Sequence, residues 1–461
     1  MFSRSNWAKQ RWVLLVQGDL EIEHQQAVEE GRDISSVEKE FDAIKSLDLA
    51  IESNQQRAEA LLDIIQTLPV KSGYAYHEPS DLAGIRNARP ALLPLGKRTL
   101  SDQELLDKAL GAWQGRVSGC LLGKPVEGCK SYTIEKYLKA QGRWPLNRYF
   151  SFEAPAELRK EMGWENWGPD IFDEGLGKLK CMPGDDDTNY TMAGIAVIKQ
   201  NNEFSPETFG MFWLNNIPGW NLCTAERIAY KNMLMAVPPP MSASYRNVYR
   251  EWIGAQIRAD GLGYVCPGDP EKAAALAWCD AAISHVKNGI YGEMWVAAML
   301  AAAYVCDDIL MIIKIGLAQV PAKSRFTENI NKILQFYKEG KTYDQVIADF
   351  RTRWNEENAH HWVHTISNAE IVAIALLWGK HDFEKSICYS VSPGFDTDCN
   401  GATVGSIVGM IIGARRMPPK WVCPWNDTLC TDVKGYSRVA VTKLAEETVE
   451  LTKKKITVKG L

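Results

Sequence analysis

The chain has 461 residues, of which 46% are hydrophobic and 24% charged, and its formal net charge at pH 7 is −5. This length suits one large domain with an appendage, or two domains. A slightly acidic chain without a basic stripe carries no electrostatic footprint for nucleic acid, and no apolar run reaches membrane-spanning length. The N-terminal residues lack the apolar core of a secretory signal, and the 11 cysteines are scattered singly, so we expect reduced thiols and a cytoplasmic location.

Residues 1–95 differ in character from the rest of the chain. Two charged helical segments with periodic apolar positions are predicted, over residues 37–51 and 58–65. A stretch punctuated by Pro and Gly then runs from Lys71 to Lys97, and no catalytic grouping occurs in the whole region. We therefore predict a helical N-terminal extension over 1–95, ending in a linker or strap, and a main domain over 96–461.

The main domain opens on a helix with a capping box, Ser101-Asp102-Gln103-Glu104, and with glycines at 111, 115, 119 and 123. A spacing of four residues puts all four glycines on one stripe of the helix, where another backbone can come very close. Pro125 ends this helix and leaves Glu127 in a constrained turn. A glutamate in such a turn is more often a surface residue than a functional one.

An irregular, aromatic-rich stretch from Tyr137 to Lys180 follows, and an insertion of this length is usually functional or a lid. Directly after it, Asp185, Asp186 and Asp187 open an apolar helical segment over 190–198. Three consecutive aspartates spread over adjacent faces of one helical turn. Aspartates at a helix start are commonly only caps, so this triad alone does not define a site.

Helical periodicity continues through the middle of the chain. Helices are predicted from 205 and over 272–286, then a loop from Lys287 to Gly292 and an apolar helix over 294–306. Further helices follow around 328–337, 343–353, 367–378 and 382–390. No alternating βαβ pattern occurs, so the predicted fold class is all-α.

A second acidic turn, Gly394-Phe395-Asp396-Thr397-Asp398, precedes an apolar segment that runs to Ala414 and carries glycines at 401, 405, 409 and 413. A membrane helix is the rival interpretation of such a stripe, but a membrane span needs about 20 apolar residues. Arg415 and Arg416 end the segment too early. We predict a buried helix, packed closely against the first glycine-striped helix or around the same site.

If the two acidic helix starts meet in one cleft, five carboxylates converge there, and their mutual repulsion requires cations. The set contains oxygen ligands and no Cys or His. This favours Mg²⁺ or a similar hard ion over zinc.

The chain resembles the ADP-ribosylglycohydrolase family over about residues 101–417. The resemblance rests on three stretches, Gly119 through Glu127, Asp185-Asp186-Asp187-Thr188, and Gly394 through Asp398. It implies a compact orthogonal helical bundle with two Mg²⁺ ions, or Mn²⁺, in a cleft. Two positions depart from the family pattern: Asp185 stands where Ser or Thr is usual, and Cys399 stands where Thr is usual. Cys is a poor Mg²⁺ ligand, so water or Asn400 can take that coordination position.

The resemblance also implies roles for individual residues. The metal ligands would be Asp186, Asp187, Asp396 and Asp398, joined here by Asp185. Catalysis would fall to Glu127, Asp187 and Asp398. Substrate would be bound by His285, Asn288, Gly289, Tyr291, Gly394 and Phe395. His285 is equally well explained as a satisfied histidine at a helix end.

The implied reaction is hydrolysis of the glycosidic bond at the anomeric carbon of ADP-ribose attached to a side chain. The partner would be an ADP-ribosylated protein or a small ADP-ribosyl or ribosyl molecule, with no nucleic acid and no membrane. Two alternatives remain: hydrolysis of another N- or O-glycoside metabolite, and a catalytically silent ADP-ribose-binding relative. The intact carboxylates argue against a catalytically silent protein, because a structural role does not need converging charges that are costly to bury.

Overall fold

The computed structural model describes residues 12–96, 98–151, 154–164 and 179–459, and these are helical for most of their length. The described part contains four short strands, in two separate pairs: β1 (Glu203–Phe204) runs parallel to β4 (Thr457–Val458), and β2 (Thr428–Cys430) runs antiparallel to β3 (Arg438–Ala440). The predicted all-α fold is confirmed. No helix in the described ranges is long and apolar enough to cross a membrane.

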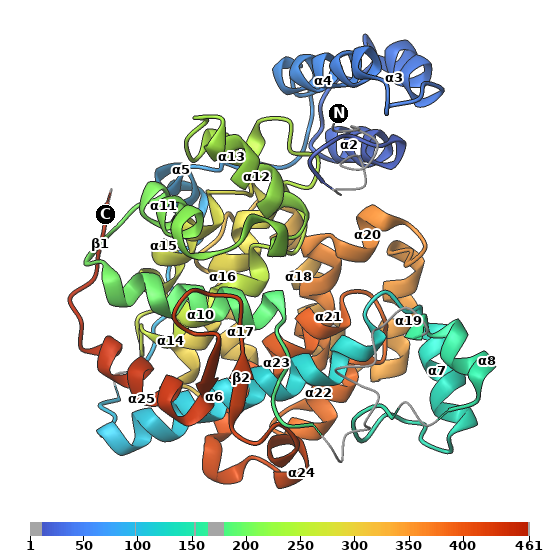
Figure 1. The fold of residues 1–461 in the computed structure, drawn as a ribbon. Coiled ribbons are helices and arrows are strands. Elements are labelled where there is room, and N and C mark those ends of the chain that lie inside the picture. Colours follow the sequence, from blue (N-terminus) through green and yellow to red (C-terminus); the bar gives the residue numbers. More distant parts are fainter. Residues whose placement is uncertain (1–11, 97, 152–153, 165–178, 460–461) are drawn as a thin grey trace.

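The N-terminal extension forms a small helical layer, drawn in blue at the top of Figure 1, except for its last helix, which is drawn apart from the others beside the body. Its helices are α2 (Gln17–Glu29), α3 (Glu38–Lys45), α4 (Glu52–Thr67) and α5 (Leu82–Ala88). The two predicted helices correspond to α3 and α4, whereas α2 and α5 were not predicted. The sequence pattern misses α2 because its buried face carries Asp19, Glu23 and Gln26 among the apolar residues, so no apolar period marks it.

The body contains the other helices (Figure 1). The first half comprises α6 (Asp102–Gly123), η1 (Lys124–Val126), α7 (Ser131–Ala140), α8 (Ala156–Glu161), α10 (Asp186–Gln200), α11 (Pro206–Asn216), η4 (Gly219–Asn221), α12 (Thr224–Leu234), α13 (Met241–Ser244), η5 (Gln256–Arg258), α14 (Ala259–Tyr264), α15 (Pro270–Ala281) and α16 (Asn288–Ala303). The second half comprises α17 (Ile309–Leu317), α18 (Arg325–Lys338), α19 (Tyr343–Arg353), α20 (Ala359–Val363), α21 (Thr365–Gly379), α22 (Phe383–Val391), α23 (Thr397–Ile412), η6 (Ala414–Arg416), α24 (Pro419–Val422), η7 (Cys423–Trp425) and α25 (Val441–Thr452).

Two sequence predictions about the body differ from the structure or fall partly outside it. The predicted loop from Lys287 to Gly292 is wrong, because α16 already begins at Asn288 and its first turn is buried. Packing of these side chains overrides the turn preference of the Asn-Gly pair. The predicted insertion over 137–180 contains the end of α7 and all of α8, and its parts over 152–153 and 165–178 lie outside the described residues.

The two glycine-striped helices, α6 and α23, pack against one another backbone to backbone, which confirms that prediction. They run antiparallel, so that Gly111 faces Gly409, Gly115 faces Gly405 and Gly119 faces Gly401. A Cβ atom added at Gly115 would lie 1.9 Å from the carbonyl oxygen of Gly405, a distance that no real contact allows. Gly413 lies at the edge of this contact, with its backbone carbon 2.8 Å from a Cβ atom added at Gly111. It ends α23 with a positive φ of 77°.

We expect Gly405→Ala to lower the free energy of unfolding by about 3 kcal/mol or more, because the added methyl group cannot enter the contact without separating the helices. A Cβ at this position would lie 2.1 Å from the oxygen of Gly115. Gly18→Ala is the matched control, since Gly18 lies in α2 with no atom within 4 Å of the new Cβ. The control should unfold at the same or a higher temperature. Equal urea midpoints for Gly405→Ala and the wild type would contradict the close packing.

Candidate metal centre

The end of α6 and the starts of α10 and α23 meet at one place in the body. The α6–α23 contact fixes this meeting, because Gly123 at the end of α6 lies against Thr397 at the start of α23. The Thr397 hydroxyl also donates a hydrogen bond to the Gly123 carbonyl, at 2.9 Å. Six carboxylates gather there and are called the acidic cluster below: Glu127, Asp185, Asp186, Asp187, Asp396 and Asp398.

The carboxylates of the acidic cluster lie close enough to repel one another strongly. Asp185, Asp186, Asp187 and Asp398 each offer an oxygen, and these oxygens lie within 4.8 Å of one another. Asp396 interacts directly with Asp398. The positive ends of the α10 and α23 dipoles point at the cluster, but they offset only part of this repulsion.

Asp185 is held by a lysine and by the helix that it caps. Its Oδ1 accepts a hydrogen bond from the Asp187 backbone N–H at 2.9 Å, and its Oδ2 forms an ion pair with the Lys124 ammonium. Although burial opposes ionisation, the Lys124 charge holds the pKa of Asp185 below its ordinary value. Both oxygens therefore already have partners, and a metal-ligand role for Asp185 stays a prediction.

Asp187 is positioned by a fully buried arginine from the glycine-striped helix α6. Arg116 donates to Asp187 Oδ1 at 2.9 Å and to Asp260 Oδ2 at 2.9 Å. The other oxygen of Asp187, Oδ2, is buried without a partner, and so is Oδ1 of Asp398. Buried polar atoms are almost always satisfied, and leaving one unpaired is costly. These two oxygens are therefore the atoms that a bound cation would satisfy, and hard oxygen donors suit Mg²⁺ or Mn²⁺.

The pKa values show how poorly the charges of the cluster are compensated. Burial and the neighbouring carboxylates raise the pKa of Asp186 to about 7, and burial raises the pKa of Asp187 well above its usual range. The pKa of Glu127 is also raised, first by the Asp398 charge and then by desolvation. Because Glu127 is exposed to solvent at the edge of the cluster, water screens part of that repulsion.

Divalent cations would take the place of these bound protons. Among the described residues, the cationic side chains that pair with the cluster are Lys124 and Arg116. Two cations cannot balance six carboxylates, and Arg116 is shared with Asp260. The donor set therefore fits hard divalent ions, whose binding would release protons from the cluster.

The turn that leads into α23 is strained and tightly anchored. Gly394 and Phe395 both have a positive φ, of 80° and 62°, and for a phenylalanine this backbone costs about 1–3 kcal/mol. Phe395 is buried with its ring edge against Phe350, at 5.0 Å between centroids. The Asn368 side-chain oxygen accepts from the backbone N–H of Asp396 at 3.2 Å. These contacts fix the direction of the turn that carries Asp396, and a substrate role for Gly394 and Phe395 stays a prediction.

The residues predicted to bind substrate from the middle helices lie at the junction with the N-terminal extension. Asn288 donates to Glu78 at 3.0 Å, the hydroxyl of buried Tyr291 donates to the Pro79 carbonyl, and Gly289 packs against His285. His285 is buried, with Nδ1 bonded to the Ser284 hydroxyl. No hydrogen bond or ion pair joins these residues to the acidic cluster within the described ranges. Their contact with substrate stays a prediction.

Sequence reasoning missed three residues that support the acidic cluster: Arg116, Lys124 and Asn368. A signal existed for Arg116, because it is a charged residue inside an apolar, glycine-striped segment. Lys124 precedes Pro125 at the end of that helix, where a lysine is unremarkable. Asn368 gives no signal, since its partner Asp396 lies 28 residues away and is brought to it only by the fold.

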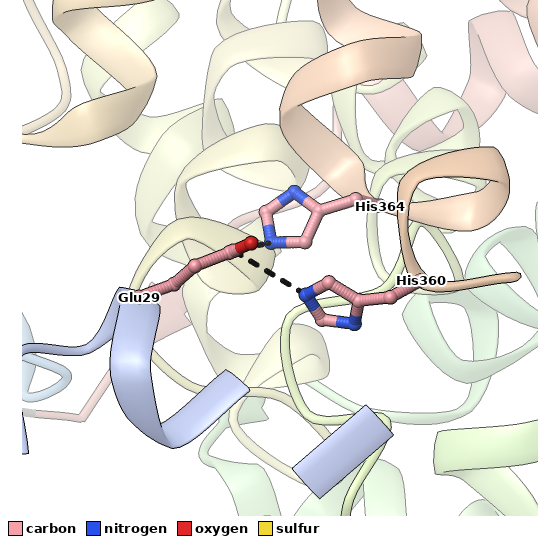
Figure 2. Close-up of side chains that lie close together, drawn as sticks. All are labelled: Glu29, His360 and His364. Atoms are coloured by element: carbon pink, nitrogen blue, oxygen red, sulfur yellow. Dashed lines mark hydrogen bonds and ion pairs between the residues drawn. The ribbon is translucent and has the colours of Figure 1, made fainter. Parts of the chain in front are cut away.

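A second group of possible metal ligands lies between the N-terminal extension and the body. Figure 2 shows the Glu29 carboxylate of α2 facing the rings of His360 and His364. Glu29 Oε2 lies 3.3 Å from Nε2 of His360 and 3.9 Å from Nε2 of His364. Glu251 approaches the same atom of His364 at 3.6 Å. By residue type and spacing alone, this group resembles a zinc site.

The hydrogen bonds on the far side of both rings argue against a metal here. The indole N–H of Trp252 donates to Nδ1 of His360, and the backbone N–H of Ile366 donates to Nδ1 of His364, each at 3.1 Å. An indole N–H and a backbone N–H cannot accept a hydrogen bond, so each Nδ1 must carry a lone pair. Each ring is therefore neutral, with its proton on Nε2. Burial lowers the pKa of His360 and favours this neutral form. The Nε2–H of His360 thus donates to the Glu29 carboxylate at 3.3 Å, whereas Nε2 of His364 lies near Glu29 and Glu251 without a hydrogen-bond partner among the described residues, and neither nitrogen keeps a lone pair for a metal.

Comparison with known proteins bears on the fold and on the family. A solved "ADP-ribosylglycohydrolase-related protein complex" matches 77% of this chain and 100% of its own chain, with 17% sequence identity and a TM-score of 0.49. At that level the likeness carries no functional argument. No curated protein matches the sequence significantly. The model of the ADP-ribosylglycohydrolase family, in contrast, matches residues 101–456. This range includes every residue of the acidic cluster and both glycine-striped helices, and the chain therefore belongs to the ADP-ribosylglycohydrolase family.

Proposed function

We propose that this protein hydrolyses a ribosyl glycosidic bond and releases ADP-ribose from a modified substrate, with Mg²⁺ or Mn²⁺ ions held by Asp186, Asp187, Asp396 and Asp398. Family membership supports a hydrolase that acts on ADP-ribosyl-type linkages. One observation carries the metal dependence: six converging carboxylates include two buried oxygens without partners, Asp187 Oδ2 and Asp398 Oδ1. We propose two ions, because the excess of carboxylates over paired cations is larger than one divalent ion removes.

The residues of the chain would divide the work of hydrolysis between them. When bound, the ions supply positive charge that can bind and orient the vicinal hydroxyls of the ribose. Glu127 is exposed at the edge of the cluster and, as a carboxylate, can take the proton from the attacking water. The transition state has oxocarbenium character, so the nearby carboxylates stabilise the developing positive charge on the ring. Lys124 and Arg116 keep the aspartates oriented through these steps.

Incubation with two defined substrates tests the reaction and the linkage together. Peptides that are mono-ADP-ribosylated on arginine or on serine are offered to the full-length protein with Mg²⁺, and with EDTA in place of Mg²⁺. We expect release of free ADP-ribose from at least one peptide, lost in EDTA. Release from neither peptide would reject hydrolysis of these linkages, and release that is indifferent to EDTA would reject the metal-dependent mechanism.

Metal binding can be measured without substrate. We expect Mg²⁺ or Mn²⁺ to raise the melting temperature and EDTA to lower it, because ions that bind only the folded acidic cluster stabilise it by mass action. At a concentration 100-fold above Kd, this contribution is about 2.7 kcal/mol per site. Ca²⁺ and Na⁺ at matched ionic strength serve as controls for ion size and for screening. A melting temperature that is independent of millimolar Mg²⁺ and Mn²⁺ contradicts the two-ion site.

A further inference from the structure

Two of the cysteines that lie far apart in the sequence are neighbours in the fold. Cys181 precedes Asp185 of the acidic cluster by four residues, and Cys430 is the last residue of β2. Their Sγ atoms are 3.4 Å apart, although 249 positions separate them in the sequence. The Cys430 thiol donates to the Cys181 sulfur. Both residues are half-buried, so small molecules can reach them.

Backbone contacts on both sides of the sulfurs hold the two segments in register. The Met182 N–H donates to the Thr428 carbonyl at 2.7 Å, and the Cys430 N–H donates to the Met182 carbonyl at 3.0 Å. Met182 itself is fully buried. Further along, Asn189 and Asp432 exchange two hydrogen bonds, at 2.9 and 3.0 Å. The contact between the thiols therefore follows from the fold and is not an accident of two loose side chains.

We propose that Cys181 and Cys430 form a redox-active dithiol that closes to an intramolecular disulfide in the presence of a small disulfide oxidant. The sulfurs are already in van der Waals contact, and closing the bond to its normal length needs an approach of about 1.4 Å. Among the described cysteines, this is the pair whose sulfur atoms are in contact.

The two thiols are chemically unequal, which sets the order of the exchange. Burial and the adjoining Cys181 sulfur raise the pKa of Cys430 to about 11, and the Cys430 thiol donates its hydrogen to the Cys181 sulfur, so Cys181 is the thiol that attacks first. The Cys181 thiolate attacks one sulfur of oxidised glutathione, and one glutathione thiolate leaves. Cys430 then loses its proton and attacks the Cys181 sulfur, which releases the second glutathione. Two protein thiols and one glutathione disulfide thus become one protein disulfide and two glutathione thiols.

Oxidation of this pair would act on the segment that carries the aspartate triad. Only Met182, Pro183 and Gly184 separate Cys181 from Asp185. Gly184 lies beside β2 as well, since a Cβ at that position would be 3.9 Å from the Cys430 carbonyl oxygen. The disulfide would therefore tie the approach to α10 covalently to β2. The inference does not depend on the reaction proposed above, because it rests on the thiol contact alone.

The test is a disulfide map of the full-length protein. The reduced protein is treated with oxidised glutathione at neutral pH, alkylated, and digested without reduction by a protease that cleaves before aspartate. Cleavage at Asp427 separates Cys430 from Cys423, so the linked peptides identify the partners. We expect a cross-linked pair containing Cys181 and Cys430, lighter by two hydrogen atoms than the two reduced peptides together. Dithiothreitol should reverse the link.

Three variants make the assignment specific. Cys181→Ser and Cys430→Ser should each abolish the link, while Cys423→Ser, which replaces an exposed cysteine, should leave it intact. Because Cys181→Ser and Cys430→Ser should each abolish the link, the test remains valid even if one of the two variants fails to fold. The proposal is overturned if Cys181 and Cys430 remain fully alkylated after oxidation, or if each carries a separate glutathione without a link between them.

Discussion

Asp398→Asn is expected to lower turnover more than tenfold, which corresponds to a barrier increase above about 1.4 kcal/mol. The substitution keeps the volume and one acceptor oxygen but removes the charge, so at least one ion should bind more weakly. The fold should survive, because Asp398 is one of six carboxylates that repel one another. Without metal, the melting temperature should stay level or rise. Titration of the melting temperature with Mg²⁺, next to the rate of ADP-ribose release, measures both effects.

Comparison variants separate metal binding from proton transfer. Asp396→Asn should weaken the Mg²⁺ response in the same way, whereas Glu127→Gln should impair turnover and leave metal affinity nearly intact. His360→Gln is the control for the second group of ligands, and it should keep the full Mg²⁺ response because that group clamps Glu29 and binds no metal. If Asp398→Asn binds metal and turns over as the wild type does, the aspartate is only a residue of a helix start and the acidic cluster is not the active site.

A protein that begins at Thr99 is expected to be insoluble or unfolded. The extension and the body share a hydrophobic core in which Phe41 and Leu61 meet Val248 and Trp252 of the body. Removing the extension would expose these apolar side chains. It would also strip buried Arg250 of both its carboxylate partners, Glu23 and Glu30, the latter at 2.8 Å. Expression, gel filtration and Mg²⁺-dependent melting of the shortened protein test this, and a soluble monomer with a normal Mg²⁺ response would show that the extension is a true appendage.

A point substitution probes the same junction in the full-length chain. Arg250→Met leaves Glu23 and Glu30 buried without their common partner, and breaking a buried ion pair in this way costs about 3–5 kcal/mol. Arg57→Met is the matched control, because Arg57 pairs with Glu40 at the surface of the extension and should change the urea midpoint little. Equal midpoints for the two variants would contradict a structural role for the buried network.

The centre of the molecule could be predicted from the sequence because its signals are local. The acidic residues at 185–187 and at 396 and 398 stand at helix starts, and a four-residue spacing marks both glycine stripes. A local pattern of this kind reveals which face of a helix is unusual. The meeting of the two stripes followed from their shared need for a partner that comes close to the backbone.

The junction with the extension could not be predicted, for an equally physical reason. Its buried face is built from charged residues such as Glu23, Arg250 and Arg325, which single-sequence patterns assign to the surface. Each becomes tolerable inside only because a partner more than 70 residues away neutralises it, as Glu251 does for Arg325. Pairing at that range leaves no trace in local periodicity. For the same reason, the sequence pattern predicted a loop at Asn288 and Tyr291, although both residues belong to the buried first turn of a helix.

The main-chain contact between α6 and α23 bears on how this protein can diverge over evolutionary time. The contact is made by main-chain atoms, which every sequence has, so the spacing between Glu127, just beyond the end of α6, and Asp398, in the first turn of α23, does not depend on how side chains elsewhere in the core are chosen. Apolar positions across the body can therefore change during evolution, or be randomised in a library, without moving these two carboxylates relative to one another. The few glycines of the contact cannot be replaced in this way, because a side chain would separate the two helices. Proteins that share this fold should consequently keep the close contact between these two central helices, while their outer helices, extensions and substrate ranges change.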